Sequence, residues 1–226
     1  MASVAEVLNK LTGKARTANL EGMARYGIAV EKRLGVSVPD MRAIGKEIGR
    51  DHRLALGLWR TGIPEARMLA SMIDDPERVT RQQGDRWVRN FNSWDVCDQV
   101  CQNLFEKTSW AWEAIPEWAA RDEEFVRRAA FVLLACLAWH DKRAADERFI
   151  RLFPVLKKGA TDERNFVRKA VNWALRNIGK RNVRLNRAAS KLAREIQRMD
   201  SKAARWIAAD AIRELESNAV RQRLSP

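Results

Sequence analysis

The stretch Phe125-Val126-Arg127-Arg128-Ala129-Ala130 recurs 41 residues later as Phe166-Val167-Arg168-Lys169-Ala170-Val171. Each copy follows an acidic helix start, Asp122-Glu123-Glu124 in the first and Asp162-Glu163 in the second. A weaker third copy is Ala204-Arg205-Trp206-Ile207. Helix pairs that repeat at about 40 residues are typical of HEAT and armadillo arrays. The repeat therefore predicts an all-α fold, an α-α superhelix of the HEAT-like or armadillo type with a basic concave face.

The rest of the chain supports an all-α fold in a single domain, residues 1–226. Apolar residues recur at helical spacing, and alternation typical of strands never lasts long. The pattern predicts uninterrupted helices over 17–33 and 144–158, among others. Nine tryptophans are many for this length, and we expect Trp59, Trp110 and Trp139 to lie in the core.

The formal net charge is +13, and it is unevenly distributed. Residues 1–121 contain 18 basic and 16 acidic side chains, whereas residues 122–226 contain 24 basic and 13 acidic side chains. Such an excess in one half indicates a polyanionic partner, and nucleic acid is the commonest. An anionic membrane surface fits less well, because no single helix joins a basic face to bulky exposed apolar residues.

The sequence gives no sign of a membrane span or of a signal peptide. No stretch approaches the roughly 18 apolar residues of a spanning helix. The first residues have neither a basic nor an apolar signal region. We therefore expect a cytoplasmic monomer with no membrane partner.

The repeat also places basic residues at matching positions. Arg127 and Arg128 in the first copy, Arg168 and Lys169 in the second and Arg205 in the third would form a ladder of positive charge. Phosphates along a duplex backbone fit such a ladder. Two alternatives stay open: these residues lie on outer surfaces, or the array is a scaffold that binds an acidic protein.

The stretch Asn92-Ser93-Trp94-Asp95-Val96-Cys97-Asp98-Gln99 carries the most distinctive chemistry. It is typical of a helix start, with Asn92 or Ser93 as the cap and Asp95 in the first turn. Trp94 and Asp98 are four residues apart, so they share one helix face. An aromatic surface beside a carboxylate suits a planar cation, although a core tryptophan beside a surface aspartate is the plainer interpretation.

Further aromatic and ionic residues could join this pair where successive helices converge. They are Tyr26, Arg128 and Trp173, and Trp173 has Lys169 and Arg176 on its helix face. Together these residues suggest a site for an electron-poor base or its sugar. A purine alkylated at N3 or N7 is cationic and leaves without a general acid. A fixed carboxylate, Asp98, would stabilise the positive charge that develops on the deoxyribose.

Metal and cofactor chemistry has little support in the sequence. The cysteines are Cys97, Cys101 and Cys136, an odd number that argues against a disulfide framework. The two histidines, His52 and His140, are distant in sequence from Cys97 and Cys101, so a zinc site is not indicated. No phosphate-binding loop, dinucleotide fingerprint or catalytic triad is present. We expect no cofactor and no metal.

Several motifs together resemble a known family. They are Leu34 to Arg42 (LGVSVPDMR), Trp59 to Ala70 (WRTGIPEARMLA), Ser93 to Asp98 (SWDVCD), Val126 to Ala130 (VRRAA) and Arg168 to Arg176 (RKAVNWALR). In this order they are similar to the bacterial AlkD-like DNA alkylation repair enzymes, HEAT-like repeat glycosylases that excise alkylated purines. The resemblance runs over nearly the whole chain.

The resemblance implies a function and a set of site residues. Asp98 matches the catalytic aspartate, Trp94 and Trp173 match two active-site tryptophans, and Arg128 matches the active-site arginine. The implied partner is double-stranded DNA that contains alkylated bases such as 3-methyladenine or 7-methylguanine, held without base flipping. We expect the DNA-binding residues to be Tyr26, Arg127, Arg168, Lys169, Arg176, Lys180 and Arg205. A non-catalytic DNA-binding HEAT protein and a protein-binding scaffold remain as alternatives.

Overall fold

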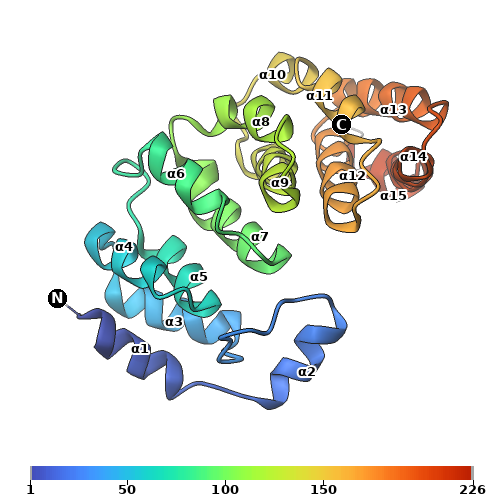
Figure 1. Ribbon diagram of the computed structural model, residues 1–226. Coiled ribbons are helices and arrows are strands. Elements are labelled where there is room, and N and C mark those ends of the chain that lie inside the picture. Colours follow the sequence, from blue (N-terminus) through green and yellow to red (C-terminus); the bar gives the residue numbers. More distant parts are fainter. Residues whose placement is uncertain (1, 225–226) are drawn as a thin grey trace. The chain divides into compact units, whose positions relative to one another are not determined.

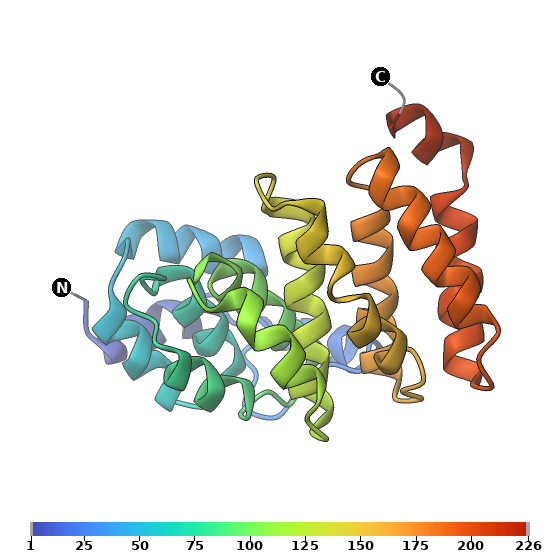
Figure 2. The ribbon, with the colours of Figure 1, turned by 90° about the horizontal axis from the view of Figure 1, so that it is seen from above.

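The structure is a computed structural model that describes residues 2–224, and every regular element in this range is a helix (Figures 1 and 2). The chain forms two compact units, Met1–Trp110 and Ala111–Pro226. The all-α prediction is confirmed, whereas a single domain over residues 1–226 stays a prediction. None of the helices within residues 2–224 has the length and apolar character that crossing a membrane requires.

The N-terminal unit consists of short helices with polar caps. Its elements are α1 (Val4–Thr12), α2 (Ala18–Arg25), α3 (Val38–Ile48), α4 (His52–Arg60), α5 (Pro64–Ile73), α6 (Arg81–Val88), α7 (Trp94–Asn103) and the 3-10 turn η1 (Phe105–Lys107). The side chains of Ser37, Asp51 and Thr80 accept amide hydrogen bonds at the starts of α3, α4 and α6. The rings of Trp59 and Trp87 stack in the core with their centroids 3.9 Å apart.

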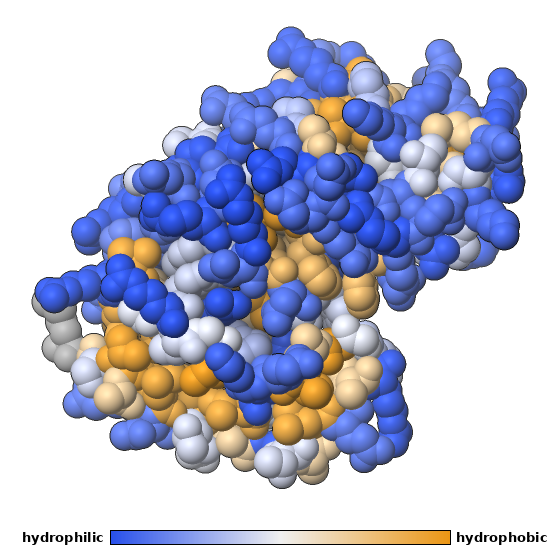
Figure 3. Space-filling view, viewed as in Figure 1, coloured by the Kyte–Doolittle hydropathy of each residue, from blue (hydrophilic) through white to orange (hydrophobic). Residues whose placement is uncertain are grey.

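The C-terminal unit contains longer helices. Its elements are α8 (Ala111–Ala119), α9 (Glu124–His140), α10 (Asp146–Ile150), α11 (Phe153–Gly159), α12 (Asn165–Gly179), α13 (Val183–Gln197), α14 (Lys202–Leu215) and α15 (Asn218–Leu224). Helices α9 and α12 lie side by side in both ribbon views (Figures 1 and 2), and α12 also packs against α13 and α14. Hydrophilic residues cover most of this unit in the view of Figure 3, while hydrophobic ones gather over part of the N-terminal unit.

The sequence repeat has a direct structural counterpart in this unit. Phe125 on α9 and Phe166 on α12 occupy equivalent repeat positions, and their rings stack with centroids 5.6 Å apart. In the next helix pair, Asn172 on α12 hydrogen-bonds Asp210 on α14, 38 residues further on. Residues about 40 positions apart thus meet between neighbouring repeats, as expected when each repeat packs against the next.

Two predicted helices are interrupted. The helix expected over 17–33 ends at Arg25, because Gly27 takes a left-handed backbone (φ +70°) directly after the C-cap residue Tyr26. The helix expected over 144–158 divides into α10 and α11. Pro154 explains this break, since its ring cannot follow an intact helical turn and is accepted in the first turn of α11 instead.

Of the three tryptophans predicted to lie in the core, two are buried and one is exposed. Trp59 and Trp110 are buried, as predicted. Trp139 is 45% exposed, so its core placement was wrong. It lies in the last turn of α9, where the cationic groups of Lys142 and Arg223 lie 5.3 and 5.5 Å from its ring centroid.

Candidate nucleic-acid interface and reaction site

Helix α7 places Trp94 and Asp98 one turn apart. Trp94 is its first residue, and both side chains are half-buried. Ser93 occupies the N-cap position, but it does not cap the helix as expected. Its hydroxyl instead donates to Oδ1 of Asp95 at 2.6 Å. The first turn of α7 is therefore held by its own side chains and by the segment that follows α2.

That segment brings Tyr26 next to Trp94. The indole Nε1 of Trp94 donates to the backbone carbonyl of Tyr26 at 3.0 Å. Because this bond uses only the backbone of Tyr26, the phenol is left in solvent, with 77% of the residue exposed. The structure thus joins two of the predicted site residues, Tyr26 and Trp94, although 68 positions separate them.

A buried arginine, which the sequence did not reveal, fixes this arrangement. The side chain of Arg33 is fully buried, and its Nη2 donates to Oδ1 of Asp95 at 2.7 Å. Its Nε donates to the carbonyl of Ala29 at 2.6 Å. Just beyond it, Oε1 of the buried Glu65 accepts from the backbone amides of Leu34 and Gly35. These bonds tie residues 29–35 to α5 and α7, and so hold Tyr26 in place beside Trp94.

The other two predicted catalytic residues belong to the C-terminal unit. Arg128 is only 5% exposed, and its Nη1 donates to the carbonyl of Phe166 at 2.6 Å. It therefore links α9 to the start of α12. Trp173 is half-buried on α12. A shared site of Trp94, Asp98, Arg128 and Trp173 stays a prediction.

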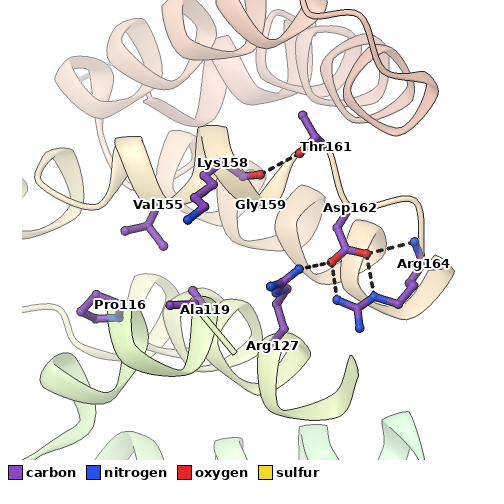
Figure 4. Close-up of a pocket in the computed structure, with 10 residues that line it drawn as sticks. Pro116, Ala119, Arg127, Val155, Lys158, Gly159, Thr161, Asp162 and Arg164 are labelled. Atoms are coloured by element: carbon purple, nitrogen blue, oxygen red, sulfur yellow. Dashed lines mark hydrogen bonds and ion pairs between the residues drawn. The ribbon is translucent and has the colours of Figure 1, made fainter. Parts of the chain in front are cut away.

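Arg127 belongs to a cluster of ion pairs that lines a pocket of about 540 Å³. Its Nη1 lies 2.9 Å from Oδ2 of Asp162, which Arg164 also holds through two side-chain nitrogens (Figure 4). Burial alone would raise the pKa of Asp162, but hydrogen bonds from Arg164 and Arg127 lower this pKa to about 2. The charge of Arg127 is thus largely neutralised within the protein.

Arg176 and Lys180 are also paired inside the unit. Glu214 on α14 accepts from Arg176 Nη1 at 2.6 Å and from Lys180 Nζ at 2.7 Å. Burial would raise the pKa of Glu214, but these two cations lower it. The sequence did not reveal the carboxylate of α14 that meets both cations, and a role for Arg176 and Lys180 in binding DNA stays a prediction.

The basic residues that keep available charge are fewer than predicted. Lys169 is exposed and makes no side-chain contact with a polar group within residues 2–224. Arg205 is half exposed, and its nearest carboxylate, on the fully exposed Asp200, is 3.4 Å away. The guanidinium of Arg168 lies over the ring of Trp206, 4.8 Å from its centroid. In the predicted ladder, Arg127 of the first copy is thus paired within the protein, whereas Lys169 and Arg205 of the later copies keep available charge. Contact of these residues with DNA stays a prediction.

The thiol groups do not resemble a metal centre. The side chains of Cys97, Cys101 and Cys136 are buried. Over residues 2–224, no three histidine, cysteine or acidic side chains are grouped closely enough to hold a metal ion. Cys97 and Cys101 lie on the core side of α7, so they pack rather than face the half-buried Trp94 and Asp98.

Comparisons with known proteins agree with this organisation. A family model described as DNA alkylation repair enzyme matches residues 7–215. A solved structure described as "A new family of proteins related to the HEAT-like repeat DNA glycosylases with affinity for branched DNA structures" is 20% identical, with a TM-score of 0.80 over 99% of this chain and 96% of that one. This likeness shows a HEAT-like repeat fold and confirms the predicted class.

Other structural matches are more remote. An engineered protein is 14% identical, with a TM-score of 0.46 over 96% of this chain and 100% of that one. A designed armadillo repeat protein in complex with the peptide (KR)4 is 15% identical, with a TM-score of 0.34 over 96% and 78%. No curated protein was found to match the chain.

Proposed function

The chain belongs to the family of DNA alkylation repair enzymes, and on that premise we propose that it is a monofunctional alkylpurine DNA glycosylase. Its substrates would be purines alkylated at N3 or N7 in duplex DNA, including 3-methyladenine and 7-methylguanine. Water would replace the base at the sugar C1′, and the products would be the free purine and an abasic site. The protein would act as a monomer, without metal or cofactor.

The observation that carries this proposal is the pair of Trp94 and Asp98 on α7. They lie one helical turn apart, and both are half-buried, so both can reach a ligand. The hydrogen bond from Trp94 to the Tyr26 carbonyl fixes the indole ring, so it need not be ordered when DNA binds. A rigid aromatic beside a carboxylate is suited to a substrate whose positive charge increases along the reaction.

The chemistry requires electrostatic help more than proton transfer. An N3- or N7-alkylated purine is already cationic, so it departs without a general acid. Positive charge then develops on the deoxyribose, where the carboxylate of Asp98 would stabilise it and orient the attacking water. The ring of Trp94 would add a cation–π attraction of ~0.5–2 kcal/mol.

We also propose that Arg128 and Trp173 complete the site. Trp173 would supply a second aromatic surface to the sugar. Because Arg128 donates to the Phe166 carbonyl and is nearly buried, it would act by holding the start of α12 in position. The lesion would be held through its backbone and sugar rather than by flipping the base into a pocket.

The test is single-turnover release of 7-methylguanine from methylated duplex DNA by the wild type and by Asp98→Asn. This change keeps the shape of the side chain and removes its charge, so we expect the rate to fall by up to about 10²–10³. Glu31→Gln is the charge-matched control, since Glu31 lies in the same unit on an exposed loop. Equal rates for Asp98→Asn and the wild type would remove Asp98 from the reaction.

Two further measurements complete this test. Affinity for undamaged duplex should stay the same or increase slightly in Asp98→Asn, because an anion that faces DNA opposes binding. Excision by the wild type should persist in chelator, because departure of a cationic purine requires no Lewis acid. Loss of activity in EDTA with recovery on adding zinc would contradict the mechanism.

A second candidate is a DNA-binding protein of the same fold without glycosylase activity. It is favoured by the structural likeness at 20% identity to a protein described as having affinity for branched DNA structures. Wild-type protein that bound branched DNA tightly but released no purine would support it. A scaffold for an acidic protein would instead bind neither methylated nor branched DNA.

A further inference from the structure

The contact between α12 and α14 follows a regular pattern of polar pairs. Asn172 donates to Asp210 at 2.7 Å, and one turn later Arg176 donates to Glu214 at 2.6 Å. The partners in each pair are 38 residues apart. Lys180 extends the series by also binding Glu214. Along this contact, the carboxylates of α14 pair with the amide nitrogen of Asn172 and with the cations of Arg176 and Lys180.

The pattern changes at the N-terminal end of the two helices. Arg168 lies one turn before Asn172. The residue 38 positions after Arg168 is Trp206, so its partner is an aromatic ring and not an acid. The guanidinium lies 4.8 Å from the ring centroid and also donates from Nη2 to Oδ1 of Asn165 at 3.0 Å. Neither of these two partners carries negative charge, and Glu163, an acid that Arg168 affects electrostatically, is exposed.

Other cations lie beside Arg168 and Trp206 in the sequence. Lys169 and Lys202 are exposed, and Arg205 is half exposed. The acids nearby neutralise little of this charge. Asp200 is fully exposed, where an ion pair is weak. Glu163 accepts from the Ser201 hydroxyl and the Ala203 amide, and it is exposed, so its attraction to Arg168 is screened by solvent. We call Arg168, Lys169, Lys202, Arg205 and Trp206 the Trp206 patch.

The exposed ring distinguishes this patch from a simple phosphate site. Trp206 has Arg168 over its ring, and it is still 40% exposed. Phosphates of an intact duplex require only the cations. An aromatic surface surrounded by cations suits single-stranded nucleic acid, because a base stacks on the ring while Lys and Arg hold the backbone.

We propose that the Trp206 patch binds an unpaired nucleotide of DNA, with its base stacked on Trp206 and its phosphates held by Arg168, Lys169 and Arg205. This function goes beyond the proposed excision, because stacking requires no chemistry at Asp98. It would let the protein hold DNA at a gap, tail or branch, where a base has lost its partner.

The test compares binding to a labelled duplex with a single-stranded tail and to the same duplex without it, at one salt concentration. Trp206→Ala should weaken binding to the tailed DNA by roughly 5- to 100-fold, the usual range for one stacked base, and should barely change binding to the blunt duplex. Trp206→Phe should retain most of the preference, because it keeps an aromatic surface.

Trp139→Ala is the matched control. Trp139, at the C-terminal end of α9, is exposed to a similar extent and has the cationic groups of Lys142 and Arg223 at 5.3 and 5.5 Å from its ring centroid. It therefore tests whether any exposed tryptophan beside cations gives the preference. Its loss should not change the preference for the tail. Equal losses in both tryptophan variants, or an unchanged preference in Trp206→Ala, would overturn the proposal.

Failure of this proposal can be told apart from failure of the proposed reaction. Asp98→Asn should lose excision and keep the preference for tailed DNA, whereas Trp206→Ala should lose that preference and keep excision from an intact duplex. If Trp206 only shields Arg168, replacing it by Phe or by Ala would leave the preference for tailed over blunt duplex unchanged.

Discussion

Arg33 shows how one residue outside the predicted site can determine the geometry of that site. Its side chain is fully buried, and it bonds to Asp95 in the first turn of α7. The spacing of Trp94 and Asp98 is local, so the sequence predicted that pair. The contact between Arg33 and Asp95 spans 62 residues and depends on the path of an irregular loop, which no helical period encodes.

A first prediction follows for Arg33→Met. The change leaves Asp95 with only 15% of its side chain exposed and without its cation. Loss of one partner from a buried ion pair costs about 3–5 kcal/mol, so the free energy of unfolding should fall by an amount in that range. Denaturant unfolding measures it. Excision should fall as well, because the segment that positions Tyr26 loses its anchor.

A double variant separates the ion pair from general damage. Arg33→Met combined with Asp95→Leu removes both charges, so it should recover much of the lost stability. If Arg33→Met unfolded at the same denaturant concentration as the wild type, the Arg33–Asp95 pair would contribute nothing to the stability of the fold.

At the scale of helices, polar bridges between neighbouring repeats determine which cations are already paired within the protein. The 41-residue repeat predicted that α9, α12 and α14 would be equivalent, and the stacking of Phe125 on Phe166 reflects this. The repeat did not reveal that Arg176 and Lys180 meet Glu214, because the carboxylate belongs to another helix. Helix periodicity predicts the face on which a residue lies, but the partner of that face depends on packing.

The Asp162 cluster provides an element-scale prediction. Because the pKa of Asp162 is about 2 in the folded protein and higher in the unfolded chain, its ionisation stabilises the fold. This stabilisation is fully present above pH ~5 and is lost as the pH falls toward 2. Asp162→Asn should therefore reduce stability at neutral pH by roughly 1–3 kcal/mol, measured by thermal unfolding.

The stability of the Asp162→Asn variant should also depend less on pH than that of the wild type. Between pH ~5 and 2 the difference in stability between wild type and Asp162→Asn should shrink, because the wild-type carboxylate becomes protonated. Asp122→Asn is a suitable control, since Asp122 is fully exposed and its bond to Arg127 is long, at 3.4 Å. A constant difference across this range would contradict the role assigned to Asp162.

For the whole molecule, the net charge of +13 overstates the charge that DNA can meet. The sequence correctly predicted the family and the all-α fold. It could not separate cations that stabilise the fold from cations that face solvent. Arg164 and Arg176 belong to the first kind, and Lys169 belongs to the second.

This distinction predicts how duplex binding should respond to salt. Each phosphate contact contributes about 0.9 to the slope of log affinity against log salt concentration. Replacing Arg168 and Lys169 by Ala should therefore flatten the slope by up to about 1.8 and weaken binding whatever the DNA sequence. Replacing Arg176 and Lys180 by Ala removes the same formal charge, but both cations are already paired with Glu214, so the slope should stay close to that of the wild type. Titrations of one undamaged duplex at several salt concentrations give all three slopes. Equal flattening by the two double variants would show that DNA responds to total charge alone, and the structural division between paired and available cations would then have no part in binding.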